Sequence, residues 1–295
     1  MKILVFGKTG QVAQSLQNFA TKDIQVEALS RDMSDLRAPD TCAAIIASSN
    51  ADVVINAAAY TAVDQAEDEE GLATLINATA PEAMARAAAL RNLPFLHIST
   101  DYVFDGTQQT TWKTSDVTAP LNAYGRSKLA GERAIQKIDG PSAILRTSWI
   151  FSSHGKNFVT TMLRLSESRK NVSIVCDQFG GPTPADAIAN TLVNMAAQMV
   201  ADISRIRQGE IYHYCGAPMT NWANFARETF RAAQREILVD DVATEEYPTK
   251  AQRPRRSYLC CKKLEEDFGI SPPNWKEYLA PAITEIKNRP DWDKP

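Results

Sequence analysis

The sequence predicts an α/β fold in which a doubly wound parallel sheet is followed by a smaller C-terminal α/β part. Three observations predict it. Short apolar segments alternate with helix-like segments through the first half of the chain, a glycine-containing turn follows the first apolar segment, and the alternation loosens after about residue 150. Strands that alternate with helices favour right-handed β-α-β units, and such units build parallel sheets.

The elements of the first half follow from this alternation. Strands are expected over residues 2–6, 24–29, 52–56, 95–99 and 143–146. Helices are expected between them, over residues 11–20, 39–49, 71–90 and 122–138. The part of the third helix around residues 77–91 is rich in alanine, which suits a buried helix that crosses closely over a sheet.

The second half is interrupted more often by glycine and proline. Helices are expected over residues 185–199, 221–233 and 275–286, and strands over residues 172–176 and 211–214. We therefore divide the chain into residues 1–150, which also receive part of 151–250, and a smaller, discontinuous part formed by residues 151–295. The smaller part is expected to cover the mouth of the sheet.

Composition excludes several classes of protein. The 295 residues include 44% hydrophobic and 23% charged residues, as in ordinary globular proteins. The net charge of −3 gives no general attraction to nucleic acid, and no apolar run approaches the roughly 20 residues that span a membrane. The N-terminal apolar run is too short for a signal peptide. Five cysteines without zinc-type pairing indicate a reducing compartment, so we expect a cytoplasmic protein.

The turn after the first strand has the spacing of a dinucleotide-binding loop. Gly7 would permit a tight turn, and Gly10 would let the backbone approach a pyrophosphate at the start of a helix. A P-loop for nucleotide triphosphates is excluded, because Lys2 occupies the place of its required first glycine. The candidate residues of this Rossmann-type turn are Gly7, Thr9, Gly10, Gln11 and Val12.

The end of the second strand bears on the choice of cofactor. An acidic residue there would bind the ribose 2′-hydroxyl of NAD, whereas an arginine can accept the 2′-phosphate of NADP. Arg31 therefore favours NADPH, although an exposed loop arginine is an equal alternative and NADH remains possible. Asp35 and Leu36 follow, and could contact the adenine.

The third strand ends in a run of small residues. Ala57, Ala58 and Ala59 would let the middle of a dinucleotide lie against the backbone, and Tyr60 and Thr61 continue the same loop. Tight packing under a neighbouring helix would explain the small residues equally well. We include all five among the predicted cofactor contacts.

A phenol and an amine stand four residues apart in the fourth predicted helix. Residues i and i+4 share a helix face, so Tyr124 and Lys128 could point into one cleft. A phenol has an ordinary pKa of about 10, and a nearby cation lowers it. With Thr100 at the end of the strand over 95–99, the pair is a candidate general acid and base. The alternative is a solvated helix face.

Together these segments resemble the extended short-chain dehydrogenase/reductase superfamily and, within it, the dTDP-4-dehydrorhamnose reductase family. The superfamily match rests on four features: the glycine turn, the small residues after the third strand, the segment over residues 99–104, and the pair Tyr124 and Lys128. The narrower match adds residues 6–12, 56–64, 120–125, 129–132, 146–149, 157–158 and 177–183.

The resemblance implies a reaction and roles. NADPH would reduce the C4 ketone of dTDP-4-dehydro-6-deoxy-L-mannose to give dTDP-L-rhamnose. Tyr124 would protonate the carbonyl oxygen, Lys128 would hold the nicotinamide ribose and lower the pKa of Tyr124, and Thr100 would orient the ketone. Two alternatives are another nucleotide-sugar 4-ketoreductase and a non-catalytic dinucleotide-binding regulatory subunit.

The resemblance also implies contacts with the dTDP-linked sugar from Asp101, Trp149 and Asn157. An exposed carboxylate and a core tryptophan are the alternatives for Asp101 and Trp149. His97 is expected to be a satisfied buried side chain, and His154 has no partner at metal-ligand spacing. Neither histidine is assigned a role.

A basic cluster near the C-terminus could bind the diphosphate of the substrate. Arginine forks match phosphate oxygens, so we assign this role to Arg253, with a solvated loop as the alternative. For Arg255 and Arg256 the solvated loop is favoured. No aromatic residues interleave with these arginines, so nucleic-acid binding is not expected.

A metal-linked dimer is not expected. Some members of the family bridge two subunits through magnesium with a glutamate of the first helix, where this chain has Ser15. A hydroxyl is a poor magnesium ligand, and Asp186 alone does not complete a site. We expect a monomer or a weak homodimer without bound metal.

Overall fold

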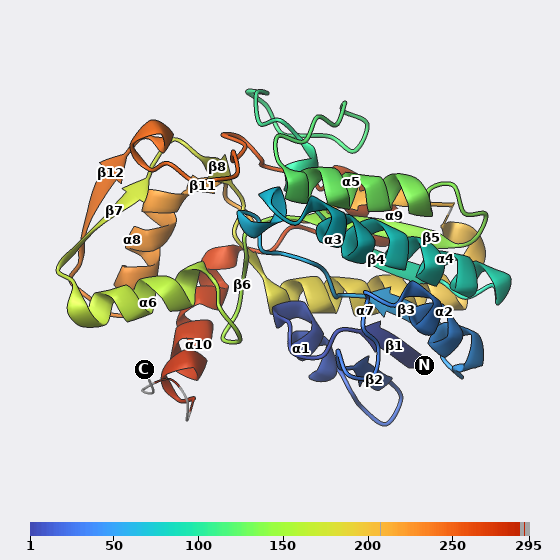
Figure 1. Cartoon of the computed structure of the whole chain (residues 1–295). Coiled ribbons are helices and arrows are strands. Elements are labelled where there is room, and N and C mark those ends of the chain that lie inside the picture. The colour runs from blue at the N-terminus through green and yellow to red at the C-terminus, as the bar shows by residue number, and fades with distance from the viewer. Residues whose placement is uncertain (207, 290–291, 293–295) are drawn as a thin grey trace.

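The computed structural model describes residues 1–206, 208–289 and 292. Its centre is a six-stranded sheet flanked by helices (Figure 1). The strand order is β10-β5-β4-β3-β1-β2, and every neighbouring pair is parallel. The order reverses at β1, as in doubly wound folds. The strands of this sheet are β1 (Lys2–Phe6), β2 (Gln25–Leu29), β3 (Val53–Asn56), β4 (Phe95–Thr100), β5 (Ser142–Thr147) and β10 (Glu210–His213).

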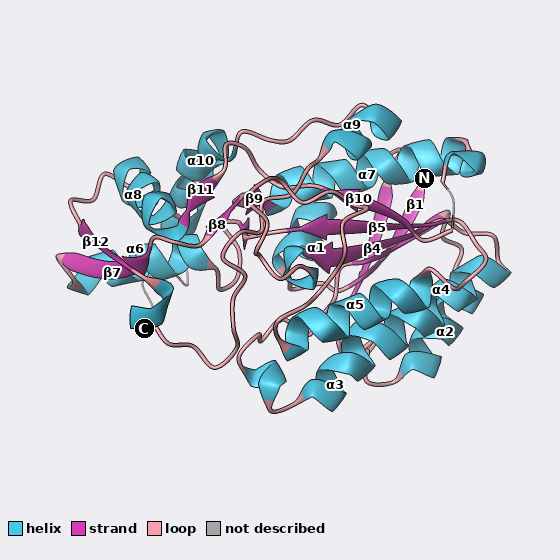
Figure 2. Cartoon of the chain, turned by 90° about the horizontal axis from the view of Figure 1, so that it is seen from above, coloured by secondary structure: helices cyan, strands magenta, loops and turns pink. Residues whose placement is uncertain are grey.

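Both faces of the sheet are covered by helices, as Figure 2 shows from above. Alternate residues of β1 enter different cores: Ile3 and Val5 pack on one face, and Leu4 and Phe6 on the other. The first face is covered by α1 (Gln11–Gln17), α7 (Ala185–Ala201) and α9 (Lys262–Phe268). The second is covered by α2 (Pro39–Ser48), α4 (Ala80–Leu90) and α5 (Ala123–Ile135), with α3 (Glu70–Thr74) beside α5.

The helix expected over residues 71–90 is interrupted by a π-helical turn, η2 (Leu75–Thr79), between α3 and α4. Close contact with α5 accompanies the interruption, because a Cβ at Gly131 would lie 2.1 Å from the backbone oxygen of Asn77. The Asn77 side chain accepts a hydrogen bond from Tyr60 N and donates one to the Ser127 hydroxyl. The alanine pattern predicts a helix but carries no signal for this wider turn.

A smaller group of elements lies beside the carboxyl ends of β4 and β5 (Figures 1 and 2). Its strands β7 (Asn171–Val175) and β12 (Leu238–Val242) form a parallel pair. Its helices are α6 (Phe158–Ser168), α8 (Trp222–Ala232) and α10 (Trp275–Lys287). Short pairs connect it to the main sheet: β6 (Ile150–Phe151) with β9 (Thr183–Pro184), and β8 (Phe179–Gly180) with β11 (Thr220–Asn221).

Three elements from beyond residue 150 join the main sheet and its layers. Strand β10 pairs with β5, and α7 and α9 pack on the face that Ile3 and Val5 enter. Single-turn helices occur at η1 (Gln65–Glu67), η3 (Asp101–Val103), η4 (Ile203–Arg205) and η5 (Thr244–Glu246). None of the helices in the described part of the chain combines the length and apolar character that a membrane crossing needs.

Candidate active site

One large cavity, about 1070 Å³ in volume, opens at the carboxyl ends of the parallel strands. Ligands of open α/β sheets bind at this edge. The cavity brings together nearly all of the side chains predicted to bind cofactor or substrate. These are Gly7, Thr9, Gly10, Gln11, Val12, Arg31, Asp35, Leu36, Ala57, Ala58, Ala59, Tyr60, Thr61, Thr100, Asp101, Tyr124, Lys128, Trp149 and Asn157.

The glycine turn forms one wall of the cavity. Gly7 has φ +109°, which is strained for residues with a side chain, and its missing Cβ would lie 3.4 Å from the carbonyl oxygen of Ala57. Gly10 faces open space, with no atom within 4 Å of the position a Cβ would occupy. Gln11 joins the wall to the smaller part, because its amide oxygen accepts a hydrogen bond of 2.8 Å from Ser152.

The arginine expected at the 2′-phosphate lies at the rim. The Arg31 side chain is 68% exposed, and its Nε lies 3.7 Å from the Asp35 carboxylate. Asp35 is held more tightly by Arg37, whose guanidinium donates two hydrogen bonds of 2.8 and 2.5 Å to it. These bonds lower the pKa of Asp35 to about 2. Asp35 therefore neutralises Arg31 only weakly, and the Arg31 guanidinium at the cavity rim can bind another anion.

The three predicted catalytic side chains come from the end of β4 and the start of α5. Asn122 caps α5, because its side-chain oxygen accepts a 2.8 Å hydrogen bond from Gly125 N. A Cβ at Gly125 would lie 2.3 Å from the backbone oxygen of Tyr102, so glycine allows α5 to approach η3. This approach sets the Tyr124 phenol beside the Thr100 hydroxyl.

The direction of the Tyr124 pKa shift is opposite to the prediction. Burial raises the pKa of the phenol to about 12, the Thr100 hydrogen bond lowers it and the Asp101 charge raises it. The Lys128 amine lies 2.8 Å from the Ile98 carbonyl oxygen and 3.1 Å from the His97 Nε2. The prediction that Lys128 lowers this pKa is therefore wrong in this structure, and Tyr124 holds its proton at neutral pH.

Asp101 is a buried carboxyl group beside Thr100. The Thr100 hydroxyl donates a hydrogen bond of 3.0 Å to its Oδ1. Its Oδ2 is buried, and no described residue supplies a hydrogen-bond partner for it. Burial raises the pKa of Asp101 to about 6, although the nearby hydroxyls of Ser257 and Thr100 act in the other direction. A buried acceptor without a partner is the kind of group that a ligand hydroxyl satisfies.

Trp149 forms an aromatic wall with a residue that the sequence did not suggest. Trp222, at the start of α8, stacks on it with ring centroids 3.5 Å apart and an interplanar angle of 9°. Trp149 has φ +46°, and a Cβ at Gly180 would lie 2.6 Å from its ring. No local pattern joins positions 149 and 222, so sequence reasoning could not find Trp222. Asn157 lines the cavity while its side chain caps α6.

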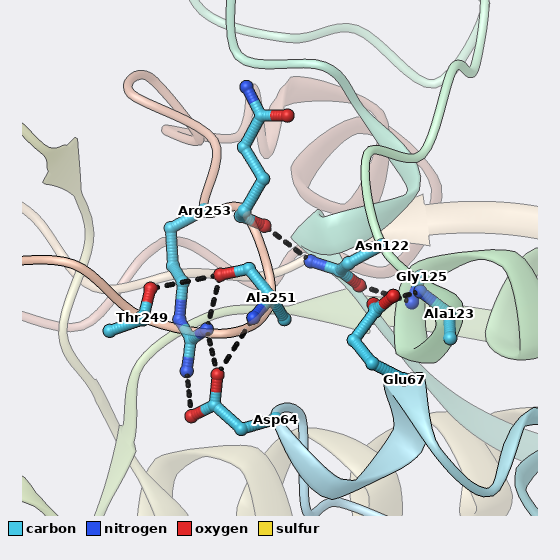
Figure 3. A network of polar contacts seen from close by, with 9 residues as sticks. Asp64, Glu67, Asn122, Ala123, Gly125, Thr249, Ala251 and Arg253 are labelled. Atoms are coloured by element: carbon cyan, nitrogen blue, oxygen red, sulfur yellow. Dashed lines mark hydrogen bonds and ion pairs between the residues drawn. The ribbon is translucent and has the colours of Figure 1, made fainter.

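Arg253 is the one predicted substrate contact that, within the described residues, does not line the cavity. Its guanidinium donates two hydrogen bonds, of 2.6 and 2.7 Å, to the carboxylate of Asp64 (Figure 3). Asp64 also accepts a hydrogen bond from Ala251 N, and its pKa is lowered to about 2. Arg253 acts on the cavity only indirectly, because it lies near Tyr102, which does line the cavity.

The same network ties the C-terminal segment to α5 (Figure 3). Asn122, the cap of α5, donates a hydrogen bond of 2.7 Å to the backbone oxygen of Gln252. Glu67 of η1 accepts a hydrogen bond of 2.7 Å from Ala123 N. The turn that carries Tyr124 is thus held from two sides, by segments that are distant in the sequence.

The two positions considered for a metal lie on α1 and α7, which pack against each other. Ser15 is buried in α1, and Asp186 is exposed at the start of α7. Among residues 1–206, 208–289 and 292, no cluster of three or more histidine, cysteine, aspartate or glutamate side chains could hold a metal ion.

Comparison with known proteins shows what the chain resembles. Residues 1–288 match the family model of the RmlD substrate binding domain. A dTDP-4-dehydrorhamnose reductase from Sinorhizobium fredii (strain NBRC 101917 / NGR234) is 42% identical over 281 residues, which cover 94% of this chain and 95% of that protein.

Two solved structures are similar over almost the whole chain. A dTDP-4-dehydrorhamnose reductase from Clostridium acetobutylicum has a TM-score of 0.89 and 33% identity, covering 97% of this chain and 100% of that one. The enzyme of the same name from Bacillus anthracis str. Ames, in complex with NADP, has a TM-score of 0.88 and 30% identity. That match covers 96% of this chain and 99% of the other.

Proposed function

Because the chain belongs to the RmlD substrate binding domain family, we propose that it is an NADPH-dependent oxidoreductase of the dTDP-4-dehydrorhamnose reductase type. It reduces the C4 ketone of dTDP-4-dehydro-6-deoxy-L-mannose to give dTDP-L-rhamnose. One observation carries the proposal: Thr100, Tyr124 and Lys128 line the same cavity as the glycine turn. Relatives named for this reaction, and one of them bound to NADP, support it.

The cavity fits the cofactor. Its volume of about 1070 Å³ exceeds that of an ordinary small-molecule site, as a dinucleotide and a nucleotide sugar together require. The open side of Gly10 admits a pyrophosphate, Ala57 to Ala59 leave room for the middle of the dinucleotide, and Arg31 supplies a cation at the rim. When bound there, NADPH supplies the hydride that the carbonyl carbon receives.

The chain's own residues hold the ketone and supply the proton. Tyr124 keeps its proton at neutral pH and donates it to the carbonyl oxygen as negative charge develops there. When the ketone binds, the Thr100 hydroxyl turns from Asp101 Oδ1 and donates a second hydrogen bond to the carbonyl oxygen, which orients the ketone and stabilises the transition state. Lys128 contributes an N–H group to the cofactor ribose. Asp101, Trp149 and Asn157 bound the space for the sugar.

Replacement of Arg31 by alanine should weaken the binding of NADPH by about 5- to 10-fold and leave NADH nearly unaffected. The estimate is that of one exposed charge-assisted contact with the 2′-phosphate. Fluorescence titration with each cofactor measures both dissociation constants. Arg86→Ala is the matched control, because Arg86 pairs with Glu82 on the exposed side of α4, away from the cavity, and should not discriminate between the cofactors. Equal losses for NADPH and NADH in Arg31→Ala would reject the phosphate role.

Activity should decrease when the pH is lowered through about 6, because Asp101 then gains a proton. Above pH 6 the carboxylate can accept a sugar hydroxyl at its unpartnered Oδ2, and below pH 6 the neutral carboxyl loses part of that capacity. We expect an acidic limb of kcat/KM near pH 6, and a loss of about 10-fold at pH 8 in Asp101→Asn. The variant should lack the limb. An unchanged limb in Asp101→Asn would assign it to another group.

Turnover with a set of dTDP-4-keto sugars tests the substrate. Rapid NADPH oxidation with dTDP-4-dehydro-6-deoxy-L-mannose, and formation of dTDP-L-rhamnose, is the expected result. Turnover of a different epimer, with this sugar untouched, would favour another nucleotide-sugar 4-ketoreductase. Binding of NADPH without turnover of any sugar would favour a regulatory subunit. We also propose a monomer or weak homodimer, which sedimentation equilibrium measures.

A further inference from the structure

A chain of hydrogen bonds runs beneath the cavity and ends on Lys128. The Ala58 N–H donates to the Asn56 Oδ1 at 3.1 Å, and the Asn56 Nδ2 lies 3.1 Å from the His97 Nδ1. The His97 Nε2 lies 3.1 Å from the Lys128 Nζ. Asn56, His97 and Lys128 are each 1% exposed or less. The proposed reaction assigns no part to Asn56 or His97.

These hydrogen bonds have a fixed donor-to-acceptor direction, because the backbone N–H of Ala58 can only donate. Because Ala58 donates to the Asn56 oxygen, the Asn56 amide nitrogen must face the ring, and it can only donate. The His97 Nδ1 must then accept, so the ring proton of the neutral imidazole lies on Nε2. That proton points at the Lys128 nitrogen. An ammonium has no lone pair to receive it, whereas a neutral amine has one.

We infer that Asn56 and His97 are positioning residues that favour the neutral amine of Lys128 over its ammonium form. In this arrangement the lone pair of Lys128 accepts from His97, and one N–H donates to the Ile98 carbonyl at 2.8 Å. One further N–H remains for the cavity. A proton gained by Lys128 would place two donors face to face, unless the imidazole changed its tautomer.

The surroundings of Lys128 either lower its pKa or carry charges that other residues neutralise. Burial lowers the pKa of Lys128 to about 8, and burial also holds the pKa of His97 well below its ordinary value. Glu132, on the same helix, acts oppositely on Lys128, but Arg146 of β5 and the Ser99 hydroxyl bind its carboxylate.

The other elements packed on α5 add little charge at this point. From η3, Asp101 faces Thr100 and Tyr124, and on α5 itself Tyr124 holds its proton. From α3, Glu70 pairs with Arg126 on the exposed side of the helix. From η2, Asn77 presents a neutral amide that bonds Ser127.

The consequence for catalysis rests on the proposed function. With a pKa of about 8, Lys128 would still be mostly an ammonium at pH 7 and would change its charge just above neutral pH. In its neutral form it would present a single N–H to a ribose hydroxyl, held in place by two fixed partners. His97 and Asn56 then act on the reaction through Lys128 without touching substrate or cofactor.

Nuclear magnetic resonance of the full, ligand-free chain tests the inference directly. A titration of ¹³Cε-labelled lysine, with Lys128→Arg to identify the resonance, should give a midpoint near 8 for Lys128. ¹⁵N-histidine spectra at pH 9 should show His97 as the neutral Nε2–H tautomer. A midpoint near 10.5, the ordinary value, or an Nδ1–H tautomer at pH 9, would overturn the inference.

Asn56→Asp should reverse the direction of these hydrogen bonds, because aspartate has almost the same shape as asparagine. A carboxylate accepts from both the Ala58 N–H and the His97 Nδ1–H, so Nε2 becomes an acceptor for an ammonium. We expect the Nδ1–H tautomer and at least a tenfold rise in the proton affinity of Lys128. The control His213→Gln changes another buried histidine of the sheet, and should leave the Lys128 midpoint unchanged. Unchanged tautomer and midpoint in Asn56→Asp would contradict the inference.

The outcomes separate this inference from the proposed function. If Asn56→Asp fails to fold, the two wild-type measurements still decide, because neither needs a variant of the chain beyond the assignment of one resonance. A Lys128 midpoint near 8 in a protein that binds no NADPH would reject the proposed function alone. Binding and turnover with an ordinary Lys128 midpoint would reject only the inference.

Discussion

Replacement of Tyr124 by phenylalanine is expected to leave NADPH binding nearly intact and to slow ketone reduction by about 10²- to 10⁴-fold. The ring keeps its place, because Asn122 fixes the first turn of α5 and Gly125 lies against Tyr102. The variant lacks the phenol that donates the proton, and the hydroxyl of Thr100, which remains, does not replace it as an acid. Stopped-flow measurement of NADPH oxidation gives the rate, and fluorescence titration gives the cofactor affinity.

A control separates loss of the acid from loss of a buried phenol. Tyr214 is a tyrosine 4% exposed that follows β10 and is not part of the cavity lining. Tyr214→Phe should therefore keep the wild-type rate. If Tyr124→Phe reduced the substrate at an unchanged rate, the proton would have to come from another group, and the role of Tyr124 would be wrong.

The features that the sequence predicts well are those set by neighbours in the chain. The apolar runs predicted the first five strands. Four of them, β1, β3, β4 and β5, are interior strands buried on both faces, whereas β2 lies at the edge of the sheet and is largely exposed. The glycine turn follows β1 and Thr100 ends β4, and both line the cavity because the two strands end at the same edge of the sheet. Strand β10 was expected over residues 211–214, but nothing local predicted that it would pair with β5.

The features that the sequence did not predict depend on partners far along the chain. Helical spacing placed Lys128 on the same helix face as Tyr124. In the structure the Lys128 amine is hydrogen-bonded to His97 and to the backbone oxygen of Ile98, both from β4. Arg253 had the chemistry of a diphosphate ligand, and the structure pairs it with Asp64, 189 positions away. In both cases a long-range hydrogen bond, which the local sequence does not reveal, determines the group that the side chain contacts in the structure.

The second large effect concerns stability. Glu132→Ala should lower the free energy of unfolding by about 3–5 kcal/mol, the cost of leaving a buried charge without its partner. Glu132 is 0% exposed and binds the guanidinium of Arg146, 2% exposed, through two hydrogen bonds of 2.9 and 2.7 Å. Its loss leaves Arg146 with the neutral imidazole of His213 and the ring of Phe104. Urea denaturation, analysed with a common m value, measures the difference.

Two further variants test whether burial is the cause. Glu70→Ala removes the partner of Arg126 from an exposed pair with side chains 44% and 45% accessible, and should cost less than about 1 kcal/mol. Replacing Glu132 and Arg146 together by leucine and methionine removes both charges, and should recover much of the stability lost in Glu132→Ala. A loss in Glu132→Ala no larger than in Glu70→Ala would mean that water solvates Arg146, and that the ion pair does not stabilise the junction of α5 and β5.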